Sequence, residues 1–341
     1  MACDTVIVPA HGMTLALQRQ CQVVSMQLLS SFRLLFVPLL LSVSGFAFCA
    51  HAQTEPSLSP IGGLPSDPIP DQPILSPAET AEHGIPLHDG YVTTLPHGDI
   101  RQAWLSQPTK RYGHGILGDS IEAAALTVRL ANRQLVSFVL PEDSVFEDIK
   151  PRLGDLDGDG KTEVILVRSY LMKGASVAVL GLKNGRLGLL AQTPAIGTAN
   201  RWLNPSILSD LDNSGLLTIG LVRTPHIGGQ LQLWQYENGA LKQLKQADGF
   251  SNHSIGSRAL GLSAILNKGN MKRILIPDAT QSRLILLESD TLTPLTSIAL
   301  PARPVQDFVV NRLANGHQNI SIALNDGTLY RLEDTTGRYF D

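Results

Sequence analysis

In this 341-residue chain, three aspartates at alternate positions are the residues whose spacing best fits a specific chemistry, the binding of a metal ion. Asp155, Asp157 and Asp159 belong to the stretch DLDGDGKTE, in which Gly158 and Gly160 can adopt the positive φ angles that a tight loop needs. Ca²⁺ takes about six to eight oxygen ligands at about 2.3–2.6 Å, from carboxylates, backbone carbonyls and water. The stretch therefore predicts one calcium site.

The predicted ligands are the carboxylates of Asp155, Asp157, Asp159 and Glu163 together with the backbone carbonyl of Lys161. Crowded carboxylates repel one another, and a bound dication turns that repulsion into attraction, so we expect the ion to be structural. A cluster of Asp and Gly can also form a plain turn without any metal. No base or nucleophile stands beside the stretch, so the sequence predicts no catalytic residue here.

An EF-hand loop opens in the same way, but it has a Glu at its twelfth position and leads into a helix. Here the twelfth position is Leu166, inside the apolar run VILV, which predicts a buried strand. The motif closely resembles the calcium loop of FG-GAP/VCBS repeats, D-x-D-G-D-G-x-x-D/E, with Glu163 as its last acidic residue. Such repeats are blades of integrin-α-like β-propellers, and the resemblance is to exported bacterial members. It implies that the ion lies between adjacent strands and holds the turn rigid.

The stretch recurs along the chain. DLDGDGKTEVILVRS is succeeded by DLDNSGLLTIGLVRT from Asp210, AILNKGNMKRILIPD from Ala264 and NRLANGHQNISIALN from Asn311. The spacings are 55, 54 and 47 residues, and each copy keeps a loop glycine and the apolar strand after it. A weaker relative, GILGDSIEAAALTV, begins at Gly115. Self-similarity at such a period predicts a repeat architecture.

The segments on the C-terminal side of the copies also repeat. After the second copy, residues 231–236 (LQLWQY) alternate as in a half-buried strand, and Asn238-Gly239 predicts a hairpin turn. Asn184-Gly185 and Asp326-Gly327 occupy the matching places in the first and last copies. Four short strands in a unit of roughly 45–55 residues is the plan of a β-propeller blade.

We therefore predict an all-β fold, a β-propeller of four-stranded blades over residues 86–341. Four copies and the weaker relative give five blades. The last unit is short, so we expect an outer strand from near Tyr91 or Trp104 to complete it and close the ring.

The later loops have lost ligands to different degrees. The second copy keeps Asp210 and Asp212 but has Ser214 and Thr218 at the other acidic positions, which makes a poor calcium site. The third and fourth copies have no carboxylate at these positions and cannot bind a cation. Their residues there are Ala264, Leu266 and Lys268, and Asn311, Leu313 and Asn315. One site, in the loop 155–163, is the expected number.

Residues 1–52 are predicted to be a leader and signal peptide. Arg33 precedes an apolar stretch, and Ala50-His51-Ala52 fits a signal-peptidase site, so the mature chain would begin at Gln53. Met26 would give a signal of more ordinary length. We accordingly expect a periplasmic or secreted bacterial protein.

Two other membrane arrangements fit the leader less well. Its apolar core is broken by Pro38 and Gly45 and is short for a span of about 20 residues. Cys49 lacks the small preceding residue expected at a lipid-modified cysteine. We expect no membrane span in the mature chain.

Residues 53–85 are predicted to be a disordered, proline-rich linker. Seven prolines interleaved with Ser, Gly and Asp favour an extended tether, because proline lacks the donor that a sheet needs. They are Pro56, Pro60, Pro65, Pro68, Pro70, Pro73 and Pro77. A proline-rich ligand for another protein is the alternative.

The composition limits which partners and which chemistry the chain can have. A net charge of −3 offers no case for nucleic acid, which would need a basic patch. All three cysteines lie in the first fifty residues, so the rest of the chain has neither a disulfide nor a thiol nucleophile. We expect a monomer.

Two functions remain open at the level of sequence. The first is a non-enzymatic, calcium-stiffened module that binds a protein or a glycan. The second is a propeller enzyme or carbohydrate-processing protein with its active site at the channel mouth, and the fold alone does not decide between them. His114 is the best candidate among the histidines, although a turn residue is the simpler interpretation. A group of carboxylates and histidines along the channel would favour the enzyme.

Overall fold

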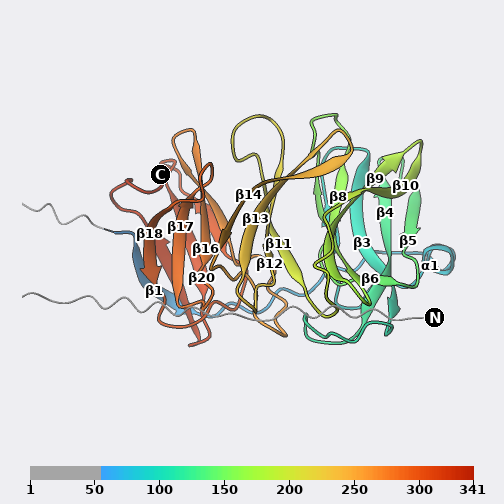
Figure 1. Ribbon diagram of the computed structural model, residues 1–341, viewed down its shortest axis with the longest axis horizontal. Helices are drawn as coiled ribbons and strands as arrows, with labels where there is room; N and C mark the ends of the chain where they lie inside the picture. The colour runs from blue at the N-terminus through green and yellow to red at the C-terminus, as the bar shows by residue number, and fades with distance from the viewer. Residues whose placement is uncertain (1–54) are drawn as a thin grey trace, which may run out of the picture. The chain divides into compact units, whose positions relative to one another are not determined.

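The computed structural model describes residues 55–341. The predicted leader, signal peptide and cleavage site after Ala52 lie outside the described residues. The described part of the chain forms twenty-one β-strands and one short helix, α1 (Pro77–His83) (Figure 1). The predicted all-β class and its four-stranded sheets are confirmed. None of the helical structure in residues 55–341 is long and apolar enough to cross a membrane.

Two of the sheets consist of four antiparallel strands in chain order. The first contains β11 (Leu203–Ser209), β12 (Thr218–Arg223), β13 (Gln230–Glu237) and β14 (Ala240–Asp248). The second contains β15 (Ala264–Lys268), β16 (Met271–Pro277), β17 (Arg283–Glu288) and β18 (Pro294–Ala299). Their hairpins form as their turn residues predict, since Asn238 and Gly239 between β13 and β14 have φ angles of 52° and 80°.

A nine-stranded sheet precedes them. It contains β2 (Thr93–Thr94), β3 (Ile100–Thr109), β4 (Glu122–Leu130), β5 (Leu135–Val139), β6 (Ser144–Phe146), β7 (Arg152–Gly154), β8 (Glu163–Tyr170), β9 (Gly174–Lys183) and β10 (Arg186–Gln192). β6 and β7 both pair with β8, at its two ends, and so act as two halves of one strand. The pair Ala123–Phe146 joins β4 to β6. Each side of this link therefore keeps the four-strand plan.

The last sheet combines the two ends of the described chain. It contains β19 (Val309–Arg312), β20 (Gln318–Ala323), β21 (Thr328–Glu333) and β1 (Ser57–Gly63), in the order β1-β21-β20-β19. In Figure 1 the blue β1 lies beside the orange and red strands of the C-terminal part. The added outer strand was thus predicted correctly in kind but not in origin, because Trp104 lies in β3 and Tyr91 lies in no strand.

The linker prediction for residues 53–85 is wrong where β1 and α1 form. β1 tolerates Pro60 because β1 is an edge strand, and its register slips between Pro60 and Gly62. Ser76 caps α1 with a capping box: its hydroxyl accepts from Glu79 N at 3.2 Å, and the Glu79 carboxylate accepts from Ser76 N at 2.7 Å. Proline at the first helical position, Pro77, supports the helix start.

Residues 64–92, here named the strap, connect the last sheet to the first. Near its start, Gln306 Nε2 donates to Pro65 O at 3.0 Å. Farther along, Gln72 Nε2 donates to Gly90 O at 3.0 Å, which folds the strap against itself. Leu87 N then donates to Leu105 O in β3 at 2.9 Å. These bonds fix a segment that its prolines alone would leave extended.

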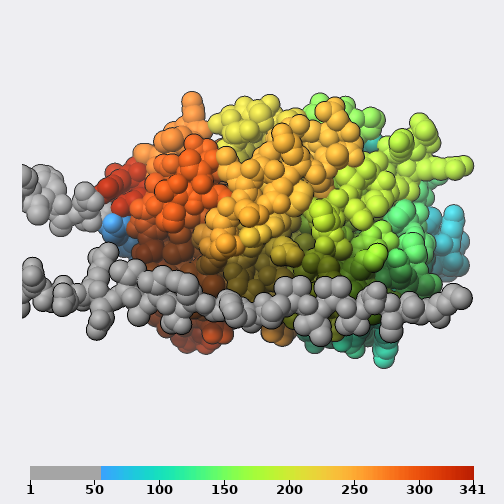
Figure 2. Space-filling view, in the orientation of Figure 1, coloured from blue at the N-terminus to red at the C-terminus, as the bar shows by residue number. Residues whose placement is uncertain are grey.

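Middle strands such as β8, β12 and β13 are covered on both faces. Seven of the eight residues of β8 are buried, whereas the outer strand β14 is mostly exposed. Residues 231–236 are also buried throughout, so the predicted half-buried strand is wrong, and Gln232 is accommodated by donating to Gln230. Neighbouring groups cover one another, as the abutting yellow and orange surfaces in Figure 2 show.

The weaker repeat copy does not occupy the place of the others. Residues 115–128 span the connection from β3 to β4 and most of β4, which is the third strand of its group. The full copies instead connect the first strand of a group to the second, as Asp155–Thr162 connects β7 to β8. The corresponding connection in the first group is residues 95–99, between β2 and β3.

Removal of β1 should destabilise the described domain. A chain that begins at Pro65 loses the β1–β21 ladder and leaves β21 as an open edge. We expect a fall of several degrees in melting temperature, since about 1 kcal/mol shifts it by about 2–4 °C in larger domains. We also expect self-association in size-exclusion chromatography. A chain that begins at Gln53 is the control, and equal melting of the two would contradict the role of β1.

Candidate metal centre

The loop that carries the three aspartates connects β7 to β8. Gly158 and Gly160 have φ angles of 76° and 82°, as their predicted role requires. Leu166, the twelfth residue of the loop pattern, is fully buried within β8. The loop therefore leads into a strand, which excludes an EF-hand.

Backbone hydrogen bonds to Asp155 shape this loop. Asp155 Oδ1 accepts from Gly158 N at 2.8 Å, and Asp155 Oδ2 accepts from Gly160 N at 2.9 Å. One carboxylate oxygen from each of Asp155, Asp157 and Asp159 lies within 4.8 Å of the other two. Three of the predicted ligands are thus brought together.

Glu163, the fourth predicted carboxylate, lies outside this 4.8 Å group. It is the first residue of β8 and is buried, and its Oε2 accepts from Leu156 N at 2.8 Å. Burial is the main cause that raises the pKa of Glu163 to about 7, and the nearby charges of Asp157, Asp159 and Asp155 add to it. Glu163 therefore accepts a hydrogen bond from the loop backbone, and the negative charges of all three aspartates help to raise its pKa.

Lys161 contributes a countercharge through its side chain. Its Nζ lies 2.6 Å from Asp159 Oδ2, and this hydrogen bond holds the pKa of Asp159 below its usual value. Both side chains are largely exposed, so the pair contributes little to stability. The predicted role of the Lys161 carbonyl as a ligand stays a prediction.

The donor set fits a hard dication. Its members are carboxylate oxygens, which hard cations prefer. The charges of the three aspartates add to the raised pKa of Glu163, which is the electrostatic sign of an acidic group that a dication would stabilise. The residues that would hold the ion are Asp155, Asp157 and Asp159, with Glu163 next to them.

The neighbouring groups fix the position of this loop. Asp99, between β2 and β3, accepts from Thr162 N at 2.9 Å through its Oδ1. On the other side, Leu217 N, from the connection between β11 and β12, donates to Leu156 O at 3.2 Å. Asp99 is a supporting residue that sequence reasoning missed, because its partner is 63 residues away.

The second loop keeps the backbone plan without the full donor set. Asp210 accepts from Ser214 N at 3.1 Å and from Gly215 N at 3.0 Å, in the manner of Asp155. Among residues 55–341, its carboxylates form no group of three ligands. The third loop is shorter still, with β15 and β16 joined by Gly269 and Asn270.

A second polar group lies at the opposite ends of the strands. Glu147, which is fully buried, lies 2.7 Å from His114 Nδ1 through Oε1 and accepts from Ser169 Oγ through Oε2. Burial raises the pKa of Glu147, and its hydrogen bonds with His114 and Ser169 oppose that rise. The Tyr112 hydroxyl is buried with no hydrogen-bond partner among residues 55–341, and its ring packs edge-on against His114.

A pair of histidines packs against the same region. His226 Nε2 lies 3.0 Å from His253 Nδ1, and His253 Nε2 lies 2.9 Å from Ser257 O. Since a carbonyl only accepts, His253 carries its proton on Nε2, and His226 Nε2–H donates to His253 Nδ1. Burial lowers the pKa of His226 to about 4 and that of His253 to about 3, so both are neutral at pH 7. Trp202 lies against both rings.

This second group was only partly predicted from the sequence. His114 was the best histidine candidate, and it does lie in a loop. Glu147, His226 and His253 were not singled out, because they come from three other connections with no common spacing. The structure places the carboxylate beside the histidine, which no local pattern encodes.

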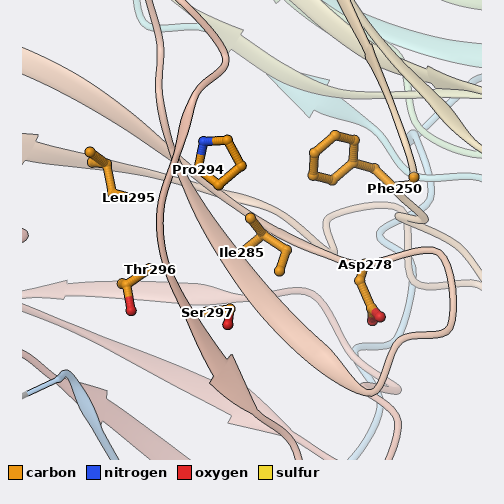
Figure 3. Close-up of a pocket in the computed structure, with 8 residues that line it drawn as sticks. Phe250, Asp278, Ile285, Pro294, Leu295, Thr296 and Ser297 are labelled. Carbon is orange, nitrogen blue, oxygen red and sulfur yellow. The ribbon is translucent and has the colours of Figure 1, made fainter. Parts of the chain in front are cut away.

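A surface cleft of about 410 Å³ lies between strands β17 and β18 and the connection that follows β14. Figure 3 shows Phe250 and Ile285 facing one another across it, with Pro294 and Leu295 on the adjoining strand. Its carboxylate, Asp278, already accepts from Ser282 N and Arg283 N. The cleft offers an apolar contact surface, and its one acidic side chain is already engaged.

Comparison with known proteins identifies no family. No protein-family model matches the chain, and no curated protein matches it. Sqt1 of Saccharomyces cerevisiae is similar at 13% identity and a TM-score of 0.42, over 72% of this chain and 64% of that one.

Two other solved structures are similar at the same level. BamB of Moraxella catarrhalis gives 12% identity and a TM-score of 0.40, over 74% of this chain and 64% of that one. Rhamnogalacturonan lyase YesW gives 14% identity and a TM-score of 0.46, over 75% of this chain and 53% of that one. The chain thus spans about half to two thirds of the three structures, a similarity too remote to assign a family or a function.

Substitution of Glu163 by Gln should change how stability depends on pH. In chelator, the folded chain holds the Glu163 proton more tightly than the unfolded chain, because its pKa is raised from 4.5 to about 7. Wild-type stability should therefore fall as pH rises from 4.5 to 7, by about 3 kcal/mol at most. Urea unfolding should show Glu163→Gln to be the more stable protein at about pH 8 and equal near pH 4.

Glu142→Gln is the control for this experiment, because its side chain is 92% exposed. It should keep the wild-type pH dependence. If Glu163→Gln and Glu142→Gln behaved alike, the buried acidic environment assigned to Glu163 would be wrong.

Proposed function

We propose that this protein is an exported, calcium-stabilised β-propeller of the FG-GAP/VCBS type, with five four-stranded blades. On this proposal, each half of the nine-stranded sheet is one blade, and the other three sheets are the remaining blades. The strand β1 completes the last blade, and the strap connects it to the first. The packing of β11 against β8, β9 and β15, and of β15 against β19, supports the expected succession of blades.

The observation that carries the calcium assignment is the group of three aspartate oxygens within 4.8 Å. Their all-oxygen character favours Ca²⁺ over softer metals. The ion would stiffen the turn between β7 and β8, to which Asp99 and Leu217 of the neighbouring groups are bonded. Its effect would therefore extend to three consecutive blades.

The biological role that we propose is non-enzymatic binding of a protein or a glycan in the bacterial periplasm or outside the cell. Apolar side chains exposed on the strap supply part of a contact surface, as Ile69 is 89% exposed and Ile74 is 94% exposed. The cleft beside Phe250 supplies a second apolar contact.

Calcium binding should depend on the first loop and not on the second. Isothermal titration of chelator-treated wild type should show one tight Ca²⁺ site, and Asp157→Ala should abolish it. A ligand at a hundredfold excess over its Kd stabilises the folded state by about 2.7 kcal/mol. Chelator should therefore lower the melting temperature of the wild type and leave that of Asp157→Ala nearly unchanged.

Asp212→Ala is the matched control, since Asp212 has the same place in the second loop. It should bind Ca²⁺ like the wild type. Equal sensitivity of wild type and Asp157→Ala to chelator would place any calcium outside the loop 155–163.

The group around Glu147 favours a second candidate, an enzyme with its centre at the opposite ends of the strands. When Glu147 is ionised, it accepts from His114 Nδ1–H and leaves Nε2 of His114 as the basic nitrogen. A carboxylate that orients a histidine in this way is a recurrent device of general-base catalysis. Burial keeps the Tyr112 hydroxyl protonated by raising its pKa, so it is a hydrogen-bond donor.

Nitrophenyl esters and glycosides are suitable probes for this second candidate. We expect slow hydrolysis by the wild type and a loss of about a hundredfold or more in His114→Ala, the size of a general-base contribution. Added imidazole should restore part of the rate. His97→Ala, an exposed histidine at the other ends of the strands, is the control. No hydrolysis above background, or full activity of His114→Ala, would exclude this centre for these substrates.

A further inference from the structure

A histidine and two aspartates meet where the strap ends. His88 and Asp89 belong to the strap, and Asp119 lies in the connection between β3 and β4. His88 Nδ1 lies 3.7 Å from Asp89 Oδ1, and His88 Nε2 lies 3.5 Å from Asp119 Oδ2. One donor atom from each residue lies within 4.8 Å of the other two. This group is separate from the aspartates of the loop 155–163.

Each of the two aspartates has one oxygen engaged by the protein. Asp89 Oδ2 pairs with Arg258 Nη1. Asp119 Oδ1 accepts from Ile121 N at 2.7 Å. The other two oxygens, Asp89 Oδ1 and Asp119 Oδ2, are the ones that face His88. The protein thus orients both carboxylates and leaves one oxygen of each toward the imidazole.

A buried oxygen without a hydrogen-bond partner points to a missing ligand. Asp89 Oδ1 is inaccessible to solvent and has no hydrogen-bond partner among residues 55–341, since His88 Nδ1 is 3.7 Å away, and the side chain as a whole is 12% exposed. Burying such an atom without a partner costs free energy, so a site of this kind requires an explanation. A cation bound to Asp89 Oδ1 supplies one.

A further carboxyl is buried in the same region. Glu122 is only 3% exposed. Burial, followed by the charges of Glu147, Asp119 and Asp89, raises the pKa of Glu122 to about 9. A cation bound to Asp89 and Asp119 would offset the repulsion that their charges exert on an ionised Glu122.

We propose that His88, Asp89 and Asp119 form a second metal site, for a first-row dication such as Zn²⁺. An imidazole nitrogen with two carboxylate oxygens suits Zn²⁺, whereas Ca²⁺ prefers oxygen ligands in larger number. Three protein ligands leave a position for water. Arg258 orients Asp89, and the backbone N–H of Ile121 orients Asp119, as hydrogen-bond partners of metal ligands commonly do.

A metal at this site would attach the strap to the connection between β3 and β4. Gln72 donates to His88 O at 3.3 Å, so the metal would also anchor the middle of the strap. Arg258 belongs to the connection between β14 and β15. A metal bound here would therefore tie the strap, the β3–β4 connection and a later group of strands together.

Zn²⁺ titration of the full chain with its first site saturated by Ca²⁺ tests the proposal. We expect one equivalent of Zn²⁺ to bind with a micromolar or lower Kd and to raise the melting temperature. His88→Gln and Asp119→Asn should each weaken binding by at least tenfold. Substitution of Co²⁺ should give visible absorption bands that both variants lose.

Two matched variants control for unspecific effects. His97→Gln removes an exposed histidine at the other ends of the strands, and Asp157→Ala removes one ligand of the calcium loop 155–163. Both should keep Zn²⁺ binding, and His88→Gln and Asp119→Asn should keep Ca²⁺ binding, which also shows that they fold. Wild-type Zn²⁺ affinity in His88→Gln and Asp119→Asn, or no wild-type binding below about 100 μM, would overturn the second site. Neither result would bear on the proposal that the loop 155–163 binds Ca²⁺.

Discussion

Both faces of β8 and β9 are covered by protein, so the sheet to which they belong depends on its neighbours to bury its apolar side chains. Seven residues of β8 and eight of β9 are buried, and β11 of the next group packs against both strands. Burial of apolar surface is the dominant favourable contribution to folding. The same requirement applies at the last sheet, where β1 must join β21 before that sheet has four strands. The strap is a consequence of this requirement, since the chain must then return to the first group.

The alternation of strand directions separates the polar chemistry of the molecule into two regions. Connections such as Asp155–Thr162 lie at one end of the strands and carry acidic, largely exposed loops. Connections at the other end carry His114 and the His226–His253 pair, and Glu147 reaches His114 from the break between β6 and β7; these groups are mostly buried. Exposure keeps the first region hydrated and suited to a hard cation, whereas burial shifts the pKa values of the second. The proposed calcium site and the candidate enzyme centre would therefore use different residues.

The acidic loop was predictable because its information is local. Asp155, Asp157 and Asp159 are close in space for the same reason that they are close in sequence, and two glycines with positive φ suffice to fold the loop. The hairpin at Asn238-Gly239 was predictable for a similar reason. The linker prediction failed because it counted prolines and did not consider that an edge strand needs only one set of backbone hydrogen bonds.

By itself, the sequence determined the all-β class, the hairpin turns and the three-aspartate loop, since each depends on residues that are close together in the sequence. Only the tertiary structure decided that residues 57–63 complete the last sheet, that Glu163 lies apart from the aspartate group, and that Glu147 meets His114. The same holds for His88 and Asp119, which approach because the strap ends at the β3–β4 connection. The physical reason is that these contacts join separate connections, whose proximity is set by the packing of whole sheets and leaves no periodic trace in the chain.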